Sequence, residues 1–534
     1  MCRVPSAPPE MQDRDVTTLD CAAPAPRGPR AHAADNAKGG DGPGLLGGDR
    51  SGLLRGGHTG TVETPHTTTC TNMNVESLHA PCTVRKTYVS GLRHTRAEVV
   101  HQELGGLGEA RTLNEICENA NVAMQALRSL GIFEAADVLV DSAPTDGPNG
   151  PQADVIIKLV EKKRLTSAST GVSTQGGEGS MDAKVSVLNL FGWAEKLDLN
   201  MELGQQSSSA FRLSASRNRW LGSKWLGTHR AQLTADVTKS ATSHVKHSSF
   251  VEKLLGGSVN CRIGDAGEGY GAHDFSAQLV LRDVCKLERN VASWPILHQR
   301  GLSLKSCLSH TFSLSRLDHP FVPTDGSSLK LTTELAGVLP PVGDVRFIKQ
   351  TLNASTFVPL LHRLSLGLSL NAGLLLPIGS QPMATGGESH ISDRFFLGGP
   401  SSMWGFRTRG VGPRALRHGP AGEGTLGPRA PRDALGGDLM AVGTAALSVR
   451  LPGKLEEANV RAHAFASAGG LTSLPELSRD GSLLNSLRAC VGVGLAMPTA
   501  VGRLELNLTH VLRRQSEDAV VGKSGVQIGI TPAF

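Results

Sequence analysis

The sequence predicts a transmembrane β-barrel of about 16 antiparallel strands, preceded by one small α+β domain and a disordered N-terminal extension. Three observations lead to this prediction. Runs of strict alternation between apolar and polar side chains recur over residues 165–534, residues 83–164 contain the strong helical periodicity, and residues 1–82 have no persistent period. The chain of 534 residues is long enough for two or three folded units.

The first 82 residues are rich in Pro, Gly, Ala and Thr. Such a stretch cannot bury enough apolar surface to offset the entropy lost on ordering, so we expect it to be disordered. It also lacks the apolar core of a secretory signal and the arginine-rich character of a clear mitochondrial presequence.

Residues 83–164 predict an independent α+β domain. A short strand at Lys86–Leu92 is followed by helical spacing over Arg96–Leu104 and, more strongly, over Leu113–Phe133. Two further strands are expected at Asp137–Asp141 and Asp154–Val160. The order βααββ predicts two helices on one face of a three-stranded sheet. The apolar positions expected on the second helix are Ile116, Ala120, Val122, Ala123, Leu127, Leu130 and Ile132, with Gly131 as its stop signal.

The remaining residues predict strands that each have one apolar face. Leu197–Leu203, Leu364–Asn371 and Arg503–Thr509 each place leucine on one face and polar side chains on the other. Soluble β-sandwiches alternate as well. However, an apolar face of nearly pure leucine opposite charged residues favours a lipid-facing surface. At about 23 residues per strand and turn, the length allows about 16 strands.

Composition excludes several other classes of protein. Mean hydropathy is −0.12, and no apolar run is long enough for a membrane-spanning helix, whereas a barrel keeps its average hydropathy near zero. The net charge of +6 is spread along the chain, which speaks against a nucleic-acid partner. Nine cysteines without C-x-x-C spacing predict neither a zinc site nor a disulfide framework.

No catalytic constellation is present in the sequence. Gly522-Lys523-Ser524 resembles the end of a phosphate-binding loop, but Glu517 stands where the earlier glycine would be required. There is no G-x-S-x-G elbow and no pair of histidines with metal-ligand spacing on a helix. We therefore expect no enzymatic activity, no catalytic residues, no metal and no cofactor.

Three motifs carry a resemblance to a known family. Phe395–Phe406 reads FFLGGPSSMWGF and resembles the F-x-L-G-G-x-x-x-x-R-G-F/Y loop of the BamA-type assembly-factor superfamily. Leu188–Glu195 is similar to its early-barrel N-x-F-G-x-x-E signature. Val449–Pro452, followed by Ala464–Gly469, is similar to its late-barrel segment. The motifs occur in the order of the family, and residues 84–164 resemble a single POTRA domain.

One POTRA-like domain without a secretory signal resembles the mitochondrial branch, the barrel of the sorting and assembly machinery. The resemblance implies a 16-stranded barrel in the mitochondrial outer membrane, with its N-terminal region in the intermembrane space. It also implies insertion of β-barrel precursor proteins through a lateral gate between the first and last strands. The implied partners are these precursors, accessory sorting and assembly subunits, and outer-membrane lipid.

The chain departs from the family pattern at one pair of positions. Trp404 replaces the loop arginine, and Ser467 stands where the family has the acidic residue that pairs with it. Joint loss is physically reasonable because a buried charge without its partner is costly. Arg407 or Arg409 could supply a cation instead, and the sequence does not decide between them. The implied lumen-loop residues are Gly398, Gly399, Trp404, Gly405, Phe406 and Arg407, and the late-barrel partners are Phe465, Ser467 and Gly469.

The C-terminus carries a fourth signal. Lys523–Ile530 fits polar-x-Gly-x-x-apolar-x-apolar, which resembles the sorting signal of mitochondrial barrel proteins and also suits any amphipathic last strand. Alternation predicts that Val526, Ile528 and Ile530 face lipid while Gln527 and Gly529 face the lumen. The implied last-strand residues are Lys523, Gly525, Ile528 and Ile530. The first strand is expected at about Ser167–Thr174, where Gly171 should weaken the seam.

Two alternative functions remain at this point. A polypeptide-translocating relative of the same superfamily would carry similar motifs. A passive solute porin is the other alternative, but porins lack a POTRA module and a glycine-rich lumen loop. Residues 84–164 and 395–406 therefore favour an assembly factor over a porin.

Overall fold

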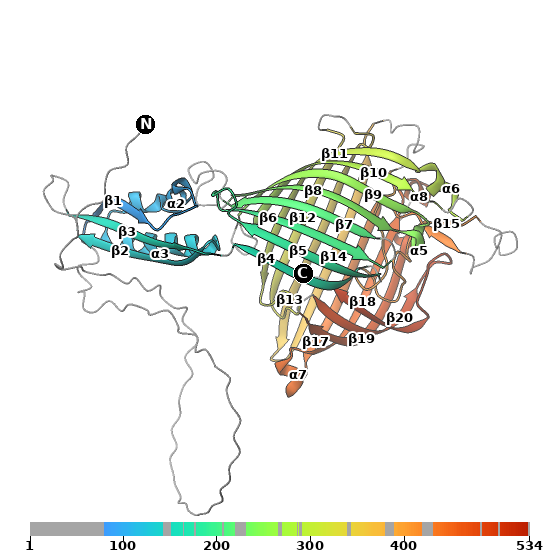
Figure 1. Cartoon of the computed structure of the whole chain (residues 1–534). Coiled ribbons are helices and arrows are strands. Elements are labelled where there is room, and N and C mark those ends of the chain that lie inside the picture. Colours follow the sequence, from blue (N-terminus) through green and yellow to red (C-terminus); the bar gives the residue numbers. More distant parts are fainter. Residues whose placement is uncertain are drawn as a thin grey trace, which may run out of the picture. The chain divides into compact units, whose positions relative to one another are not determined.

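The computed structural model describes residues 80–142, 151–163, 165–175, 178–205, 208–218, 231–264, 270–285, 287, 291–338, 343–379, 389–418, 431–480, 483–499 and 502–531. The expectation of disorder for the N-terminal extension falls almost entirely on residues 1–79, which lie outside the described residues. The chain divides into two compact units between Lys163 and Arg164 (Figure 1).

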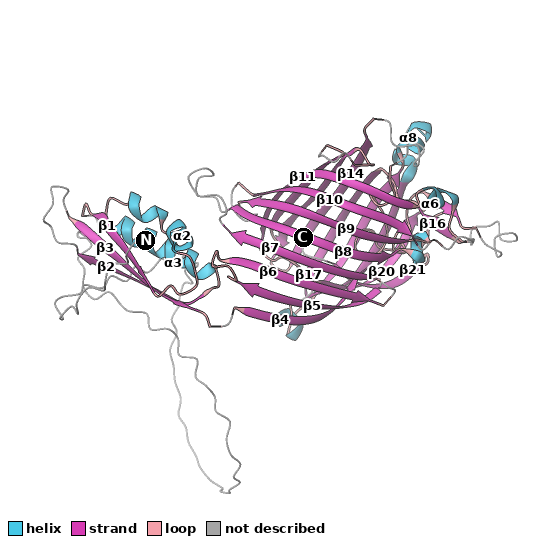
Figure 2. Ribbon diagram, turned by 45° about the horizontal axis from the view of Figure 1, so that its top comes forward, coloured by secondary structure: helices cyan, strands magenta, loops and turns pink. Residues whose placement is uncertain are grey.

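The first unit is an α+β domain with the predicted βααββ order. Its sheet has the strand order β1-β3-β2, in which β1 runs parallel to β3 and β2 runs antiparallel to it. The two helices cover one face of this sheet (Figure 2). The elements are β1 (Thr83–Ser90), α2 (Ala97–Glu103), the 3₁₀ helix η1 (Gly105–Glu109), α3 (Leu113–Ser129), β2 (Phe133–Ser142) and β3 (Gln152–Glu161).

Local chemistry explains where α3 begins and ends. The Thr112 hydroxyl accepts a hydrogen bond from the backbone N–H of Glu115, which is an N-cap. Gly131 has φ +73°, a conformation that favours glycine just past a helix. The expected helix of Leu113–Phe133 was therefore too long, because Phe133 already opens β2. Val122 was wrongly placed on the apolar face, because its side chain is 60% exposed.

The second unit is a single 16-stranded antiparallel sheet that curls into a barrel, as Figures 1 and 2 show. Consecutive strands pair throughout, except that β14 pairs with β17 around the β15–β16 hairpin. The strands are β4 (Thr166–Gln175), β5 (Glu178–Leu188), β6 (Glu195–Gly204), β7 (Ser209–Asn218), β8 (Ala231–Ser243), β9 (Val251–Ile263), β10 (Ala272–Cys285), β11 (Gly301–Leu317), β12 (Gly326–Ala336), β13 (Phe347–Leu361), β14 (Leu364–Pro377), β17 (Leu439–Arg450), β18 (Arg461–Thr472), β19 (Leu487–Pro498), β20 (Arg503–Arg513) and β21 (Ser524–Thr531).

Short elements lie in the connections between these strands. They are α5 (Val245–Ser248), α6 (Trp294–His298), β15 (Arg414–Leu416), β16 (Arg432–Ala434), α7 (Lys454–Glu457), α8 (Leu474–Asp480) and the 3₁₀ helix η3 (Leu483–Ser486). No helix in the described part of the chain is long and apolar enough to span a membrane.

The apolar faces of the strands point outward, as the alternation predicted. On β20, Leu506 and Leu508 are about half exposed, whereas Glu505 and Asn507, which alternate with them, are buried inside the barrel. The outer surface is consequently a belt of exposed leucine, isoleucine and valine, which is the surface that a barrel presents to lipid.

The sheet has two edges, β4 and β21, and no pairing joins them among the described residues. Because the number of strands is even, the start of β4 at Thr166 and the end of β21 at Thr531 lie at the same rim. We call this the terminal rim. The connection from β14 to β17, which holds β15 and β16, leaves from the opposite rim.

Candidate functional site: the lumen loop and the last strand

The connection between β14 and β17 folds into the barrel. Its residues Phe395, Leu397, Met403 and Phe406 are buried together with side chains of the strand walls. The wall residues in this cluster are Cys307, Ala336, Phe347, Leu375, Val442, Phe465, Leu471, Cys490 and Val511. We refer to residues 389–411 as the lumen loop, because their apolar side chains are buried against the inner faces of the strands between β11 and β20.

Two glycines shape the turn of the lumen loop. Gly398 has φ +113° and Gly399 has φ +99°, and side chains other than hydrogen are strained at such values. A Cβ on Gly398 would also lie 2.6 Å from the carbonyl oxygen of Arg407. Gly399 then exchanges backbone hydrogen bonds with Met403, at 2.9 and 3.1 Å. Both glycines are therefore required by backbone geometry as well as by space.

Gly405 stands where the loop touches the wall. Its φ is +86°, and a Cβ there would lie 2.9 Å from Cγ2 of Val511 and 3.5 Å from Cβ of Cys490. Phe406, the next residue, is completely buried. The close approach of this backbone to β19 and β20 leaves no room for a side chain.

The loop is hydrogen-bonded to the last strand. The backbone N–H of Gly405 donates to Oε1 of Gln527 at 2.6 Å, and Nε2 of Gln527 donates to the carbonyl of Phe406 at 3.1 Å. Gln527 lies in the middle of β21. Its side chain therefore links residues 404–406, which we call the tip of the lumen loop, to the edge strand of the sheet.

The segment that leads into β21 is tied to the loop as well. The N–H of Arg407 donates to the carbonyl of Ala519 at 2.9 Å, and the N–H of Ala519 donates to the carbonyl of Gly410 at 2.8 Å. The N–H of Val521 donates to the carbonyl of Gly405 at 3.1 Å. The loop thus holds both β21 and the connection that precedes it.

Trp404 packs its ring against the inner wall near Gly529. The side chain is only 8% exposed, and a Cβ on Gly529 would lie 3.1 Å from the indole and within the volume of Pro400. Trp404 also borders an internal cavity of about 110 Å³ that reaches Phe465 and Glu505. Position 404, where the sequence resemblance implied an arginine, is therefore occupied by a large aromatic ring that needs no counter-charge.

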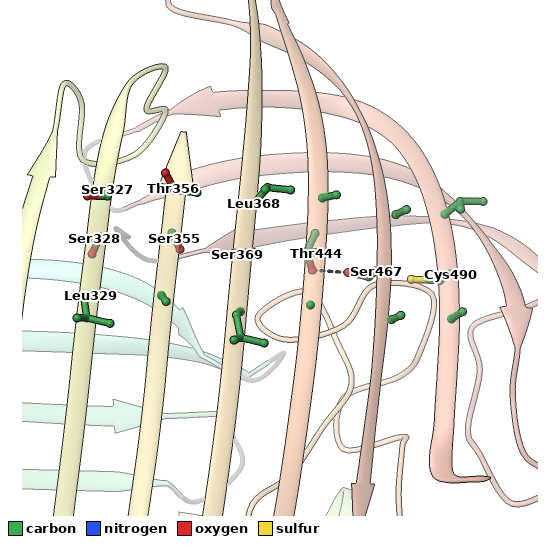
Figure 3. Close-up of a pocket in the computed structure, with 18 of the residues that line it drawn as sticks. Ser327, Ser328, Leu329, Ser355, Thr356, Leu368, Ser369, Thr444, Ser467 and Cys490 are labelled. Atoms are coloured by element: carbon green, nitrogen blue, oxygen red, sulfur yellow. Dashed lines mark hydrogen bonds between the residues drawn. The ribbon is translucent and has the colours of Figure 1, made fainter. Parts of the chain in front are cut away.

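Ser467 lies on β18, where it is 3% exposed and shares a hydrogen bond with the hydroxyl of Thr444 (Figure 3). Its neighbour Gly469 faces Val442, and a Cβ there would lie 2.7 Å from Cγ2 of that side chain. An open hollow of about 690 Å³ adjoins this region and is almost wholly apolar. A pair of neutral hydroxyls therefore stands where the sequence resemblance implied a carboxylate.

Neither candidate arginine takes over the missing charge among the described residues. Arg407 is exposed, and the Arg409 guanidinium lies over the ring of Phe396 at 4.0 Å. Gly410, the next residue, accepts a backbone hydrogen bond from Ala519 in the connection between β20 and β21, so Arg409 lies near the opposite rim. Neither arginine therefore replaces a charge at position 404 or 467.

The last strand has the orientation that the sequence predicted. Val526, Ile528 and Ile530 are 62%, 68% and 44% exposed on the outer surface, while Gln527 and Gly529 contact the lumen loop. At the start of the strand, the carbonyl of Lys523 accepts from Val511, and Gly525 pairs with Thr509 of β20.

On the first strand, Gly171 pairs with Asp182 of β5. A Cβ at Gly171 would lie 2.8 Å from the carboxylate of Asp182. The absence of a side chain at Gly171 therefore leaves room for the carboxylate of Asp182 beside the edge strand.

The early-barrel motif forms the turn between β5 and β6. Asn189, Gly192 and Ala194 all have positive φ, and Oδ1 of Asn189 accepts from the N–H of Ala194 at 2.9 Å. The carboxylate of Glu195 accepts from the N–H groups of Phe191 and Trp193. The motif is therefore a self-bonded turn, and its Asn, Gly and Glu each satisfy a specific backbone requirement.

Sequence reasoning missed some of the contacts that define this site. Gln527 was predicted to face the lumen, but its role as the hydrogen-bond partner of the loop was not. The bonds of Ala519 and Val521 were not foreseen either, because backbone pairing across more than 100 residues leaves no local pattern. In the described ranges, no group of His, Cys, Asp and Glu is arranged to hold a metal ion.

Comparison with known proteins agrees with this geometry. Residues 189–534 match the model of the Omp85 superfamily domain. The chain is 30% identical over 459 residues to sorting and assembly machinery component 50 homolog A of Xenopus laevis, covering 84% of this chain and 89% of that protein. The homolog of Homo sapiens is 30% identical over 457 residues, with the same coverage.

A similar fold exists among solved structures. The crystal structure of BamA from Haemophilus ducreyi lacking POTRA domains 1–3 superposes with a TM-score of 0.67 and covers 84% of each chain at 19% identity. The superposition shows a common fold, whereas the sequence matches show membership of a common family. The chain belongs to the Omp85 superfamily and, within it, to the family of the sorting and assembly machinery component 50 homologs.

Proposed function

We propose that this protein inserts and folds β-barrel precursor proteins into the mitochondrial outer membrane, through a lateral gate between β4 and β21. The relatives are named as components of a sorting and assembly machinery. The observation that supports a gate most directly is the sheet itself, whose two edge strands have no partner across the seam in the described structure.

The cost of unpaired backbone groups in lipid explains how such a seam could bind a precursor strand. An unpaired backbone group in lipid costs several kcal/mol, roughly, so a precursor strand gains free energy by pairing with an exposed edge. The process needs no covalent step, and we propose none. Residues Lys523, Gly525, Ile528 and Ile530 on one side and Gly171 on the other would border the gate.

The lumen loop would keep β21 in place while the gate is open. Gln527 holds the loop from the middle of the edge strand, and the loop also bonds the connection before it. The last strand is therefore supported from inside the barrel even without a hydrogen-bonded neighbour on its outer edge.

The first unit would act as a POTRA domain in the intermembrane space. Its sheet order leaves β1 and β2 as edge strands, and such edges can pair with an added strand. We propose that precursors or accessory sorting and assembly subunits bind there by strand addition, while outer-membrane lipid contacts the outer belt of the barrel.

A passive porin is disfavoured by the apolar cluster that the lumen loop forms against the inner wall, because the interior of a solute channel is polar and water-filled. The translocating alternative shares the fold and is separated by experiment. An inserted client stays in the membrane, whereas a translocated client passes through it.

The test uses mitochondria in which this chain is the sole copy of its kind. A radiolabelled porin precursor is imported, and the mitochondria are then extracted with alkaline carbonate and treated with protease. The proposal expects a carbonate-resistant, folded porin that forms more slowly when the chain is depleted. Unchanged porin assembly after depletion would refute it, and a client that is released in soluble form inside the outer membrane would indicate translocation.

A further inference from the structure

A buried carboxylate stands at the base of the lumen loop. Asp393 is 2% exposed and lies two residues before Phe395, where the apolar part of the loop begins. Burying a carboxylate is costly unless cations and hydrogen bonds compensate it. The surroundings of Asp393 therefore matter to the position of the whole loop.

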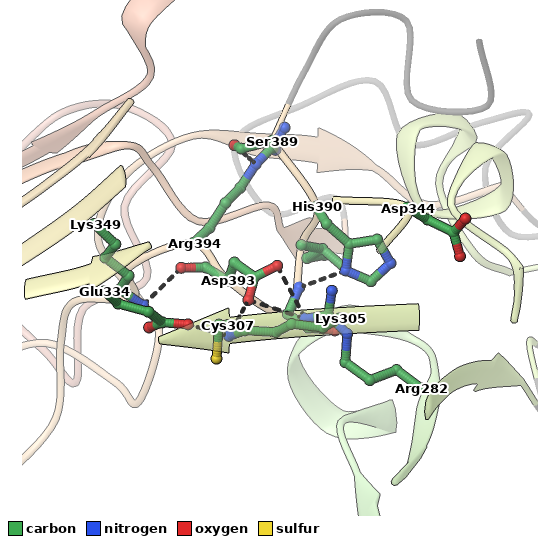
Figure 4. A network of polar contacts seen from close by, with 12 residues as sticks. Arg282, Lys305, Cys307, Glu334, Asp344, Lys349, Ser389, His390, Asp393 and Arg394 are labelled. Atoms are coloured by element: carbon green, nitrogen blue, oxygen red, sulfur yellow. Dashed lines mark hydrogen bonds and ion pairs between the residues drawn. The ribbon is translucent and has the colours of Figure 1, made fainter. Parts of the chain in front are cut away.

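Three cations from three different strands converge on this residue (Figure 4). Nη1 of Arg282 on β10 is 2.9 Å from both carboxylate oxygens, and Nζ of Lys305 on β11 is 2.9 Å from Oδ1. Nζ of Lys349 on β13 donates to the Asp393 carbonyl at 2.7 Å. Glu334 on β12 pairs with Lys305 and is the second carboxylate of the cluster.

Further contacts fix the same stretch of chain. The N–H of Ile391 donates to Oε1 of Gln299 at 2.6 Å, and Nε of Arg394 donates to the Ser389 hydroxyl at 2.9 Å. Nζ of Lys349 also lies 4.6 Å from the centre of the Phe395 ring. The base of the loop is thus held to the wall formed by β10, β11 and β13.

The rest of the loop transmits this position to its tip. Phe395 exchanges backbone hydrogen bonds with Gly437, and Leu397 accepts from Val411. The tip then contacts β21 through Gly405 and Gln527. A bonded path therefore runs across the lumen from β10–β13 at one end to the edge strand at the other.

We propose that Asp393 is the electrostatic anchor of the lumen loop and a positioning residue for β21. The anchor acts at the base, where the loop enters the lumen, and the tip is left to apolar packing and neutral hydrogen bonds. The structural part stands on geometry alone, while its consequence for insertion rests on the proposed function.

A different role is also consistent with the contacts. Asp393 could serve only to neutralise Arg282 and Lys305, which would otherwise repel one another inside the wall. The two roles differ in what happens at the tip. If Asp393 is an anchor, its removal releases the tip even when one cation is removed with it. If Asp393 only neutralises the cations, removing one cation together with Asp393 keeps the tip in place.

The reactivity of native Cys490 reports whether the tip is packed against the wall. Its thiol-bearing side chain is 1% exposed on β19, in the same cluster as Phe406, and the Gly405 backbone covers it. The experiment treats full-length protein in detergent with N-ethylmaleimide and measures modification of each cysteine by peptide mass spectrometry. Cys117, which is buried in the first unit, is the internal reference.

Three variants are compared with the wild type. Asp393→Asn removes the charge, and the double variant Asp393→Asn with Arg282→Gln removes one charge of each sign. Asp433→Asn is the matched control. Asp433 is a fully buried carboxylate of the same connection and is paired with Arg417, but it lies in β16 rather than at the loop base.

The anchor predicts faster modification of Cys490 in both Asp393 variants, by about tenfold or more, because the tip opens locally more often. Cys117 and the Asp433→Asn protein should retain wild-type rates. Wild-type protection of Cys490 in the double variant would overturn the proposal, as would equal exposure in Asp433→Asn. If the single variant does not fold, the charge-balanced double variant decides the question alone.

Insertion of imported porin precursor is measured in parallel. Under the proposal, insertion slows in the Asp393 variants and not in Asp433→Asn. If wild-type protein inserts no precursor, the proposed function fails while the Cys490 result still decides the anchor. Exposure of Cys490 with wild-type insertion kinetics would overturn the role of Asp393 in positioning β21 for insertion.

Discussion

Single residues of the lumen loop are chosen by backbone geometry more than by chemistry. Gly398, Gly399 and Gly405 all have φ between +86° and +113°, and each is also short of space for a Cβ. Gly405 differs from the other two because its neighbours belong to the barrel wall and the last strand. Its substitution should therefore act on the contact between loop and strand.

Gly405→Val is expected to loosen the tip of the loop. The β-branched side chain would meet Val511 and Cys490, with an overpacking cost of about 1–3 kcal/mol, in addition to strain from the positive φ. We predict slower assembly of imported porin precursor in mitochondria whose sole copy carries the change, while the level of the variant itself remains measurable.

Gly443→Val is the matched control for that substitution. Gly443 lies on β17 with ordinary backbone angles, and a Cβ there would have no atom within 4 Å. It should assemble porin at the wild-type rate. Equal kinetics for Gly405→Val and wild type would contradict the role of the loop in supporting β21.

Gln527→Leu tests the side chain that joins loop and strand. The change would leave the N–H of Gly405 and the carbonyl of Phe406 without their partner, at a cost of about 1–3 kcal/mol for each buried group. We predict that the folded, heat-modifiable band converts to the unfolded form at a lower temperature. Ile528→Val, on the outer face of the same strand, is the control and should shift this temperature little.

The sequence predicted some of these residues and not others, and the difference has a physical reason. A glycine that needs positive φ is visible within a short motif, so the loop glycines and the place of Trp404 could be anticipated. Gln527 could be assigned to a face but not to a partner. Asp393 gave no signal, because Arg282 and Lys305 approach it from 111 and 88 residues away.

Among the elements, β21 has the two most clearly different faces. One face contacts the lumen loop, and the other exposes Val526, Ile528 and Ile530. The alternation that predicted this division depends on only two residues per period, so eight residues suffice to display it. The end of α3 was harder to predict, because apolar residues continue past Gly131 into β2.

Ile528→Lys should therefore impair insertion of the chain itself. A lysine that faces lipid near the middle of the bilayer costs about 2–4 kcal/mol in a transmembrane barrel. We predict less carbonate-resistant protein for Ile528→Lys after import into mitochondria. Lys523→Gln, just before the strand begins, should remain at the wild-type level, and equal resistance of both variants would show that Ile528 does not face the hydrocarbon.

At the scale of the whole molecule, the lumen loop connects distant parts of one sheet. Strands β10–β13 hold its base, and β19–β21 receive its tip. A barrel that opens at an edge needs such support, because the edge strand has lost the neighbour that would otherwise fix it. The same connection packs an apolar cluster against the inner wall, so one element supports the last strands and occupies part of the lumen.

The parity of the sheet makes a prediction about topology. Thr166 and Thr531 lie at the terminal rim, and the first unit directly precedes β4, whereas α6 lies at the opposite rim. If the first unit is in the intermembrane space, an epitope there and one at the C-terminus should survive protease added to intact mitochondria. An epitope inserted beside the exposed Trp294 of α6 should be cleaved under the same conditions. Opening the outer membrane should then expose all three. Cleavage of the first-unit epitope in intact organelles would reverse the proposed orientation, and different fates for the two epitopes of the terminal rim would contradict the even number of strands.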